Sequence, residues 1–264
     1  MEKTTRLQID VESRNMIASG VSDCGLRRQK NEDSIYLDKS GTTVLLADGM
    51  GGHEKGAEAS RVTLEAIAPF LEPESIESEL MDITDGGGTP PSVSCIMSLI
   101  DTAVIKANDV VYNRNCKEKL QRFMGTTLVG LVIAEGKYAV RFHVGDSRIY
   151  KLRDSGLEQL TKDHSAHVAW KDGGREGPEP STNVITRAIG PTPAVSPTVD
   201  WEECLPGDIY LLCSDGLSDM ISDDDILRIM ISEGTAAGIA NEMADAANRA
   251  GGKDNISVIV CKIR

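Results

Sequence analysis

Residues 44–49 read Val-Leu-Leu-Ala-Asp-Gly, and residues 210–216 read Tyr-Leu-Leu-Cys-Ser-Asp-Gly. The apolar runs predict two buried strands, over residues 42–47 and 208–213. Each strand then meets a carboxylate, Asp48 or Asp215. Asp-Gly is a common turn pair, so a turn is the simpler interpretation of either copy alone. Because the same ending occurs twice, we favour a functional role for both aspartates.

Similar runs elsewhere in the chain predict further strands and four helices. The further strands are predicted at 126–134, 137–144, 147–152 and 255–263, with weaker ones at 17–21 and 34–37, and the helices at 57–70, 92–113, 223–231 and 236–250. Short connections at 134–137 and 145–146 indicate antiparallel hairpins. The helices come in pairs, which predicts an α+β fold of two packed antiparallel sheets with helices on the outer faces.

Composition limits the possible functions. The chain has 264 residues, which we interpret as one domain over 1–264. Its 28 Lys and Arg against 41 Asp and Glu, a net charge of -13, argue against nucleic acid or an anionic membrane as a partner. The polar N-terminus lacks the apolar core of a signal peptide, so we expect a cytoplasmic protein. The six cysteines show no zinc-site spacing and are expected to be reduced and mostly buried.

Further acids stand beside the other predicted strands. Asp146 lies in a tight turn between two strands, Asp254 directly precedes the last strand, and Glu32 and Asp33 precede an early one. If these strand ends converge, carboxylates about 4 Å apart repel by roughly 4 kcal/mol per pair at an effective dielectric near 20, so the cluster needs cations. Oxygen ligands without Cys or convergent His select Mg²⁺, Mn²⁺ or Ca²⁺, and a distributed site of this kind is typical of two-metal hydrolysis.

Six motifs in order now give a specific resemblance. They are RQKNED at 28–33, LADGMGGH at 46–53, GTT at 125–127, VGDSR at 144–148, CSDGL at 213–217 and GKDN at 252–255. Together they resemble the motif set of bacterial PP2C (PPM) metal-dependent serine/threonine protein phosphatases, over nearly the whole chain. The resemblance implies two antiparallel sheets between helix pairs (α-β-β-α layers). It also implies hydrolysis of phosphoserine and phosphothreonine in proteins by a metal-activated water at a binuclear Mg²⁺ or Mn²⁺ centre.

The resemblance also implies a role for each site residue. Asp48 would bridge the two ions, the Gly49 carbonyl would bind one of them, and Asp215 and Asp254 would complete the second site. Asp146, with Asp215, would hold a weaker third ion. Glu32 and Asp33 would act mainly through water, and Arg28 would bind the substrate phosphate with its forked guanidinium. Partners would be phosphorylated proteins, among them a serine/threonine kinase or its substrates, and we expect a monomer.

Some positions leave alternatives open. Animal members of the family place a histidine where this chain has Met50, which cannot donate a proton, so the general acid is not identified. His53 is weighed equally as loop structure and as a supporting group. We expect His143 to pack in the core, Asn255 to cap backbone groups, and Arg148 to pair with a carboxylate. Residues 163–183, rich in Gly, Pro and charge, resemble the family's flap, which Trp170 would fix to the core.

Two other functions are weighed. A catalytically inactive module that binds a phosphorylated partner would not need the full set of acids and Arg28. A hydrolase of small phosphate esters would prefer nucleotides or sugar phosphates to a phosphopeptide.

Overall fold

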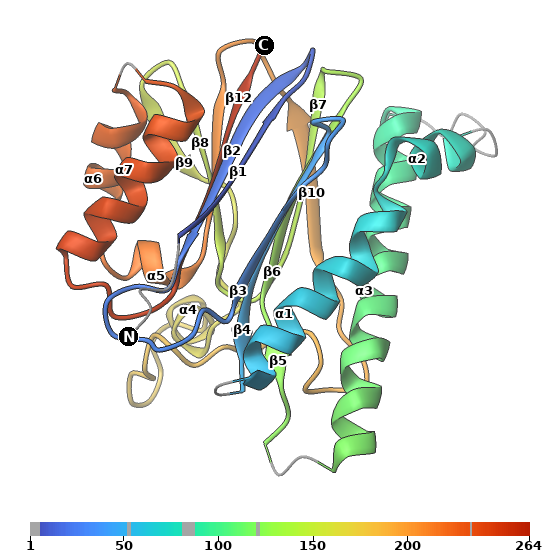
Figure 1. Ribbon diagram of the computed structural model, residues 1–264. Helices are drawn as coiled ribbons and strands as arrows, with labels where there is room; N and C mark the ends of the chain where they lie inside the picture. Colours follow the sequence, from blue (N-terminus) through green and yellow to red (C-terminus); the bar gives the residue numbers. More distant parts are fainter. Residues whose placement is uncertain (1–5, 52–53, 81–87, 120–121, 233) are drawn as a thin grey trace.

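The computed structural model describes residues 6–51, 54–80, 88–119, 122–232 and 234–264, which form two packed sheets (Figure 1). Every strand pairing recorded in them is antiparallel. Sheet A has the order β1 (Leu7–Glu12), β2 (Met16–Asp23), β12 (Ile256–Ile263), β11 (Ile209–Cys213), β8 (Arg148–Arg153), β9 (Gly156–Gln159). Sheet B has the order β10 (Thr198–Glu203), β7 (Tyr138–Val144), β6 (Leu128–Ala134), β4 (Thr43–Met50), β3 (Asp33–Leu37), and β5 (Gly125–Thr126) also pairs with β4.

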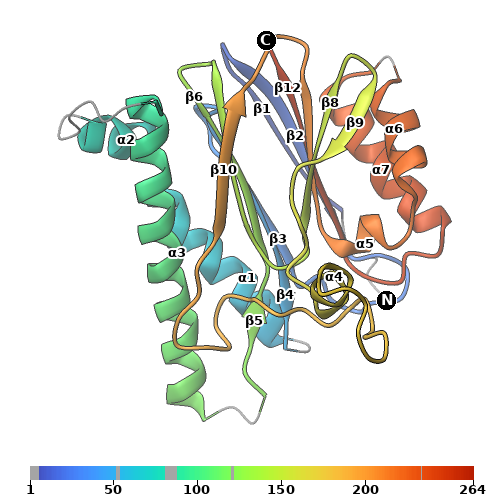
Figure 2. The ribbon, with the colours of Figure 1, turned by 180° about the vertical axis from the view of Figure 1, so that it is seen from behind.

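Helices cover the outer face of each sheet (Figures 1 and 2). Sheet B is covered by α1 (Glu54–Ile67), the short η1 (Ala68–Phe70), α2 (Pro73–Leu80) and α3 (Pro91–Glu118). Sheet A is covered by α5 (Asp215–Ser218), α6 (Asp223–Met230) and α7 (Ala236–Arg249). The prediction of an α+β fold with two antiparallel sheets between helices is confirmed.

Three apolar clusters hold these layers together, and strands β4 and β11 each contribute to two of them. Leu45 packs under α1 and α3, whereas its neighbour Leu46 packs between the sheets. On β11, Leu211 faces α6 and α7, and Leu212 faces the other sheet. Both faces of these strands are therefore buried, which explains why their sequences are continuous apolar runs and not alternating ones.

The structure excludes the simpler alternative, in which each Asp-Gly pair is a turn. Strand β4 continues through Asp48 and Gly49 to Met50, because these residues still pair with β3 and β5. Asp215 begins the short helix α5. Neither aspartate lies in a turn that reverses a strand, so a turn does not account for either one.

The predicted hairpin at 145–146 is also wrong. Strand β7 belongs to sheet B and β8 to sheet A, so Gly145 and Asp146 carry the chain from one sheet to the other. Phe142 of β7 packs under α3 in one apolar cluster, whereas Tyr150 of β8 packs with α6 in another. Because the two side chains belong to different clusters, the two strands lie in different sheets. This crossing places Asp146 between the two sheets.

Several elements were not predicted. These are β1, β9, β10, α2, α5 and α4 (Ala166–Asp172). Helix α4 lies inside the segment predicted as the flap, and the Ser165 hydroxyl caps it by accepting a hydrogen bond from the Val168 N–H. Trp170 does not fix this segment to the core, because its indole N–H donates to the Gly177 carbonyl of the same segment. Within the described residues, no helix combines the length and the apolar character needed to cross a bilayer.

Candidate active site

Asp33 and Asp48 stand directly opposite each other on β3 and β4. The backbone of Asp48 is held by two threonines: its carbonyl accepts from the Thr127 N–H and the Thr126 hydroxyl, both at 2.8 Å, and its N–H donates to Thr127 Oγ1 at 3.1 Å. Asp33 Oδ2 accepts from the Ser214 hydroxyl at 3.0 Å, across the gap between the sheets. The Asp33 carboxylate and the backbone of Asp48 therefore have a fixed place at the sheet interface.

Gly49 is required by its surroundings. A Cβ at this position would stand 2.2 Å from the Gly56 carbonyl oxygen and 2.5 Å from that of Glu32, both of them backbone atoms. A Cβ at Gly56 would in turn lie 2.9 Å from both the Gly49 carbonyl oxygen and a Glu32 carboxylate oxygen. The close approach of these three residues brings the Gly49 carbonyl and the Glu32 side chain to the same place.

Asn255 joins the remaining motifs through its side chain. Its amide donates to the carbonyls of Cys24 (3.0 Å) and Lys30 (2.9 Å), and its Oδ1 accepts from the Glu32 N–H at 2.8 Å. The prediction that Asn255 caps backbone groups is confirmed. A Cβ at Gly216 would be only 1.8 Å from the Asn255 carbonyl oxygen, so the start of α5 packs directly on this network.

The pKa shifts show that the carboxylates interact with one another. Burial, followed by the charges of Asp33, Asp215 and Asp254, holds the pKa of Asp48 well above its usual value. Burial and the charges of Asp146 and Asp254 raise the pKa of Asp215 to about 7. Two acids reach a pKa of about 6: Asp33, through burial and despite hydrogen bonds from Ser257 and Ser214, and Asp146, through burial and the charge of Asp163.

A bound cation would reduce the repulsion between these carboxylates and would also provide a partner for carboxylate oxygens that lack a hydrogen bond. Asp33 Oδ1 and Asp215 Oδ1 are buried and make no hydrogen bond within the described part of the chain. Buried polar atoms normally have partners, so these oxygens fit a site for an oxygen-preferring ion. No group of three Asp, Glu, His or Cys side chains in the described ranges forms a ligand set by itself. Backbone and water oxygens would therefore have to contribute.

The predicted acids Asp33, Asp48, Asp146, Asp215 and Asp254 are thus brought together. Asp215 and Asp254 line a pocket of about 350 Å³ with Thr182 of the predicted flap, Asp219 and Lys253. Sequence reasoning missed Thr182 and Asp219. Asp219 lies four residues after Asp215, a spacing that places both on one face of a helix, but α5 was not predicted.

Arg28 contacts the site through an ion pair with Asp254. Its Nη2 donates to Asp254 Oδ2 at 2.6 Å, and 49% of its side chain is exposed. The group predicted to bind phosphate therefore pairs with a predicted ligand. Arg148, by contrast, forms a two-pronged pair with Asp163 at 3.0 and 2.7 Å, which confirms the prediction of a carboxylate partner.

Two other predictions are confirmed. His143 is buried, and its ring stacks on that of His164 with centroids 4.3 Å apart. Five of the six cysteines are buried, Cys116 being the exposed one. Burial raises the pKa of the Cys213 thiol to about 12, so this residue is not a thiolate nucleophile.

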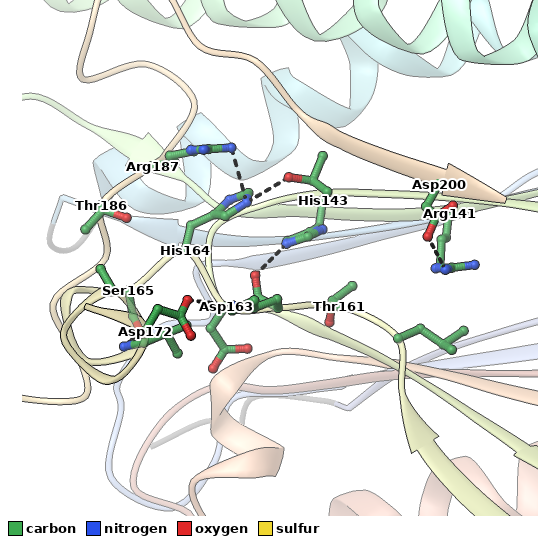
Figure 3. Close-up of a pocket in the computed structure, with 15 residues that line it drawn as sticks. Arg141, His143, Thr161, Asp163, His164, Ser165, Asp172, Thr186, Arg187 and Asp200 are labelled. Carbon is green, nitrogen blue, oxygen red and sulfur yellow. Dashed lines mark hydrogen bonds and ion pairs between the residues drawn. The ribbon is translucent and has the colours of Figure 1, made fainter. Parts of the chain in front are cut away.

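The surroundings of Met50 are defined, but His53 lies outside the described residues. Met50 lines a groove of about 470 Å³ with residues 185–188, 191, 192 and 194–196. A second pocket, of about 410 Å³, shares Thr186 and Arg187 with this groove and is lined by His143, His164 and α4 residues (Figure 3).

Comparison with known proteins agrees with this geometry. The sequence profile of the family described as "Protein phosphatase 2C" matches residues 26–249. The chain belongs to the PP2C family. This PP2C chain is 38% identical over 249 residues to the serine/threonine protein phosphatase PstP of Mycobacterium tuberculosis, an alignment that covers 92% of the chain and 44% of PstP. It is 33% identical over 264 residues to the protein phosphatase PhpP of Streptococcus pneumoniae, covering 92% and 96%.

Solved structures give the same result. A crystal structure of M. tuberculosis PstP matches with a TM-score of 0.79 at 36% identity, covering 95% of this chain and 99% of that chain. The catalytic domain of PstP in complex with two manganese ions matches with a TM-score of 0.77, also at 36% identity, covering 94% and 98%. The PP2C chain thus spans less than half the length of full PstP but nearly all of its catalytic domain. The predicted family and fold are confirmed.

Proposed function

We propose that this chain is a metal-dependent phosphatase that hydrolyses phosphoserine and phosphothreonine in proteins at a binuclear Mn²⁺ or Mg²⁺ centre. The observation that carries the proposal is the meeting of Asp33, Asp48, Asp215 and Asp254, which come from distant parts of the sequence, with pKa values raised for the first three. Membership of the PP2C family and the relatives' names support it. The intact set of acids and Arg28 argues against an inactive binding module.

In this proposal the predicted residues hold the ions. Asp48 would be shared by both, the Gly49 carbonyl would bind one, and Asp215 and Asp254 would complete the second site. Glu32 and Asp33 would act through water, and Asp146 with Asp215 would hold a weaker third ion. When bound, the ions activate the attacking water and balance the negative charge of the phosphoryl group.

The protein's own groups orient the substrate and the acids. Ser214 and the paired strand β4 fix Asp33, while Thr126 and Thr127 fix the backbone of Asp48, so the Asp33 carboxylate and the main chain that carries Asp48 are positioned before any ligand binds. Arg28, on leaving Asp254, presents two parallel N–H groups to the phosphate. Met50 has no proton to donate, so the leaving oxygen takes its proton from water or from another group.

A substrate comparison tests the proposed function. With Mn²⁺ present, we expect a higher kcat/KM for a phosphothreonine peptide than for nucleotides or sugar phosphates, because a protein phosphatase uses contacts beyond the phosphate. Phosphate release measured for all three, with and without chelator, checks this. A preference for the small esters would favour the alternative function, a hydrolase of small phosphate esters. Phosphate release that is the same with and without chelator would contradict the metal centre.

Replacing Arg28 should weaken substrate recognition. We expect Arg28→Ala to lower kcat/KM for the phosphopeptide about 10- to 100-fold, since it removes a charge-assisted contact worth about 1.5–3 kcal/mol. Arg28→Lys should recover only part of the loss, because lysine cannot offer two parallel N–H groups. Arg61→Ala, an exposed arginine on α1 that pairs with Glu65, is the matched control. Equal kinetics for Arg28→Ala and the control would contradict the assignment.

The finer features belong to the same proposal. We propose a single catalytic domain over residues 1–264, with residues 163–183 as its flap, acting as a monomer in the cytoplasm. The phosphoproteins it acts on would include a serine/threonine kinase or the substrates of that kinase.

A further inference from the structure

His164, the second residue of the proposed flap, is tied at two points to the turn that carries Asp146. The His164 N–H donates to the Gly145 carbonyl at 2.9 Å, and the Gly145 N–H donates to His164 Nδ1 at 3.1 Å. Gly145 directly precedes Asp146, in the segment that crosses from sheet B to sheet A. A side chain 19 positions away thus holds the backbone beside a proposed cation ligand.

The Gly145 contact decides which ring nitrogen of His164 accepts. Because Nδ1 accepts from the Gly145 N–H, the proton of the neutral ring lies on Nε2, which is 3.0 Å from Thr198 Oγ1 and donates to it. Arg187 Nη1 lies 3.4 Å from the same nitrogen and, being a donor itself, makes no hydrogen bond with Nε2 in this tautomer. The ring stacks on His143, whose own Nε2 donates to the Lys162 carbonyl at 2.9 Å. Figure 3 shows both rings among the side chains that line the pocket next to α4. Burial, with His143 and Arg187 nearby, lowers the pKa of His164 to about 4, so Nδ1 stays free of a proton near neutral pH.

The opposite side of Gly145 is also restrained. Gly145 has a φ of +107°, and a Cβ there would lie 2.7 Å from Thr127 Cγ2, so only glycine fits. Thr127 Oγ1 lies 2.7 Å from the hydroxyl of Ser147, the residue on the other side of Asp146. Thr127, which also bonds the backbone of Asp48, therefore restrains the backbone of the turn at residues 145–147 on one side. His164, in the flap, restrains it on the other side.

We propose that His164 is a positioning residue that sets the place of Asp146 for the weakest of the proposed cation sites and joins this site to the base of the flap. The proposal rests on the proposed function, because it takes Asp146 as a ligand. Without the ring acceptor, the Gly145 N–H loses its partner, and on the side of the flap the turn is held only by the backbone bond from the His164 N–H. Partners that orient ligands in this indirect way typically change metal affinity about 10- to 100-fold when removed.

Calorimetric titration of the metal-free full chain with Mn²⁺ tests the proposal. The variants are His164→Leu, which removes the acceptor; His164→Asn, whose side-chain oxygen can accept from Gly145; and Thr198→Val, which removes the hydroxyl beside Nε2 and leaves the contact of Nδ1 in place. We expect His164→Leu to weaken the weakest site about tenfold or more while the two tighter sites change less than about twofold. His164→Asn should stay within about threefold of the wild-type protein at every site, and so should Thr198→Val.

Each other result would overturn the proposal. These results are equal losses in His164→Leu and His164→Asn, equal weakening of all sites, unchanged binding in His164→Leu, or a wild-type chain that binds only two ions. Phosphopeptide hydrolysis by the wild-type chain, measured separately, keeps the two proposals distinct: activity can persist while the role of His164 fails.

Discussion

Asp48→Asn should lower kcat/KM for a phosphothreonine peptide by at least about 1000-fold, more than the roughly 10- to 100-fold typical of residues that only support a ligand. Asp48 is the acid that the charges of Asp33, Asp215 and Asp254 all act on, so it lies at the centre of the cluster. In the proposed mechanism it contacts both ions, and its loss therefore affects both. Phosphate release at saturating Mn²⁺ measures the effect.

The same substitution should stabilise the protein when no metal is present. Asparagine removes a charge that is costly to bury among other acids, so the melting temperature of Asp48→Asn in chelator should exceed that of the wild-type chain. A variant that loses activity while its melting temperature rises has lost ion binding and is not simply unfolded. Asp101→Asn, on the exposed side of α3, should leave both measurements unchanged. Full activity in Asp48→Asn would contradict the binuclear centre.

The parts of the structure that sequence could predict are those set by local pattern. The buried runs that end at Ala47 and Cys213 identify β4 and β11, and the period of α3 is clear because Ile96, Ile100 and Ala103 lie on one buried face. The acids were found because each stands next to such an element. Asn255 and Arg148 were predicted correctly from the chemistry of their side chains.

The parts that sequence missed depend on contacts between distant segments. The turn at Gly145 and Asp146 has the same local pattern whether β7 and β8 pair or separate, and only the packing of Phe142 and Tyr150 in different clusters decides this. The two bonds between His164 and Gly145 leave no signal at either position alone. Helix α4 was missed because its flanking glycines and prolines predict a loop.

Metal binding should stabilise the protein more at pH 8 than at pH 5. Asp33, Asp146 and Asp215 have folded-state pKa values of about 6, 6 and 7, above the usual value near 4 for an unfolded aspartate. Their contribution to stability is therefore fully present below about pH 4 and is lost as pH rises through 6 to 7. Each pH unit between the two pKa values of one group corresponds to about 1.4 kcal/mol. At pH 8 the acids are ionised and repel, and Mn²⁺ then offsets the repulsion.

The difference in melting temperature between samples with Mn²⁺ and with chelator measures this effect. At pH 8 and free Mn²⁺ 100-fold above its Kd, binding contributes about 2.7 kcal/mol, which for a chain of this size raises the melting temperature by about 5–10 °C. At pH 5 protons compete with the ions, and we expect less than half of this rise.

Other titrating groups do not produce the same pattern. His143 and His164 have lowered pKa values, so their contribution to stability grows as pH rises toward their unfolded value near 6.5. They act in both samples, and the subtraction removes them. Asp23 and Asp208, whose pKa values are lowered by Arg6 and Arg153 against the effect of burial, contribute almost fully by pH 5. Asp215→Asn removes the acid with the highest of the three values and should make the Mn²⁺ effect less dependent on pH. An equal rise at pH 5 and pH 8 in the wild-type chain would show that the ions bind away from this cluster.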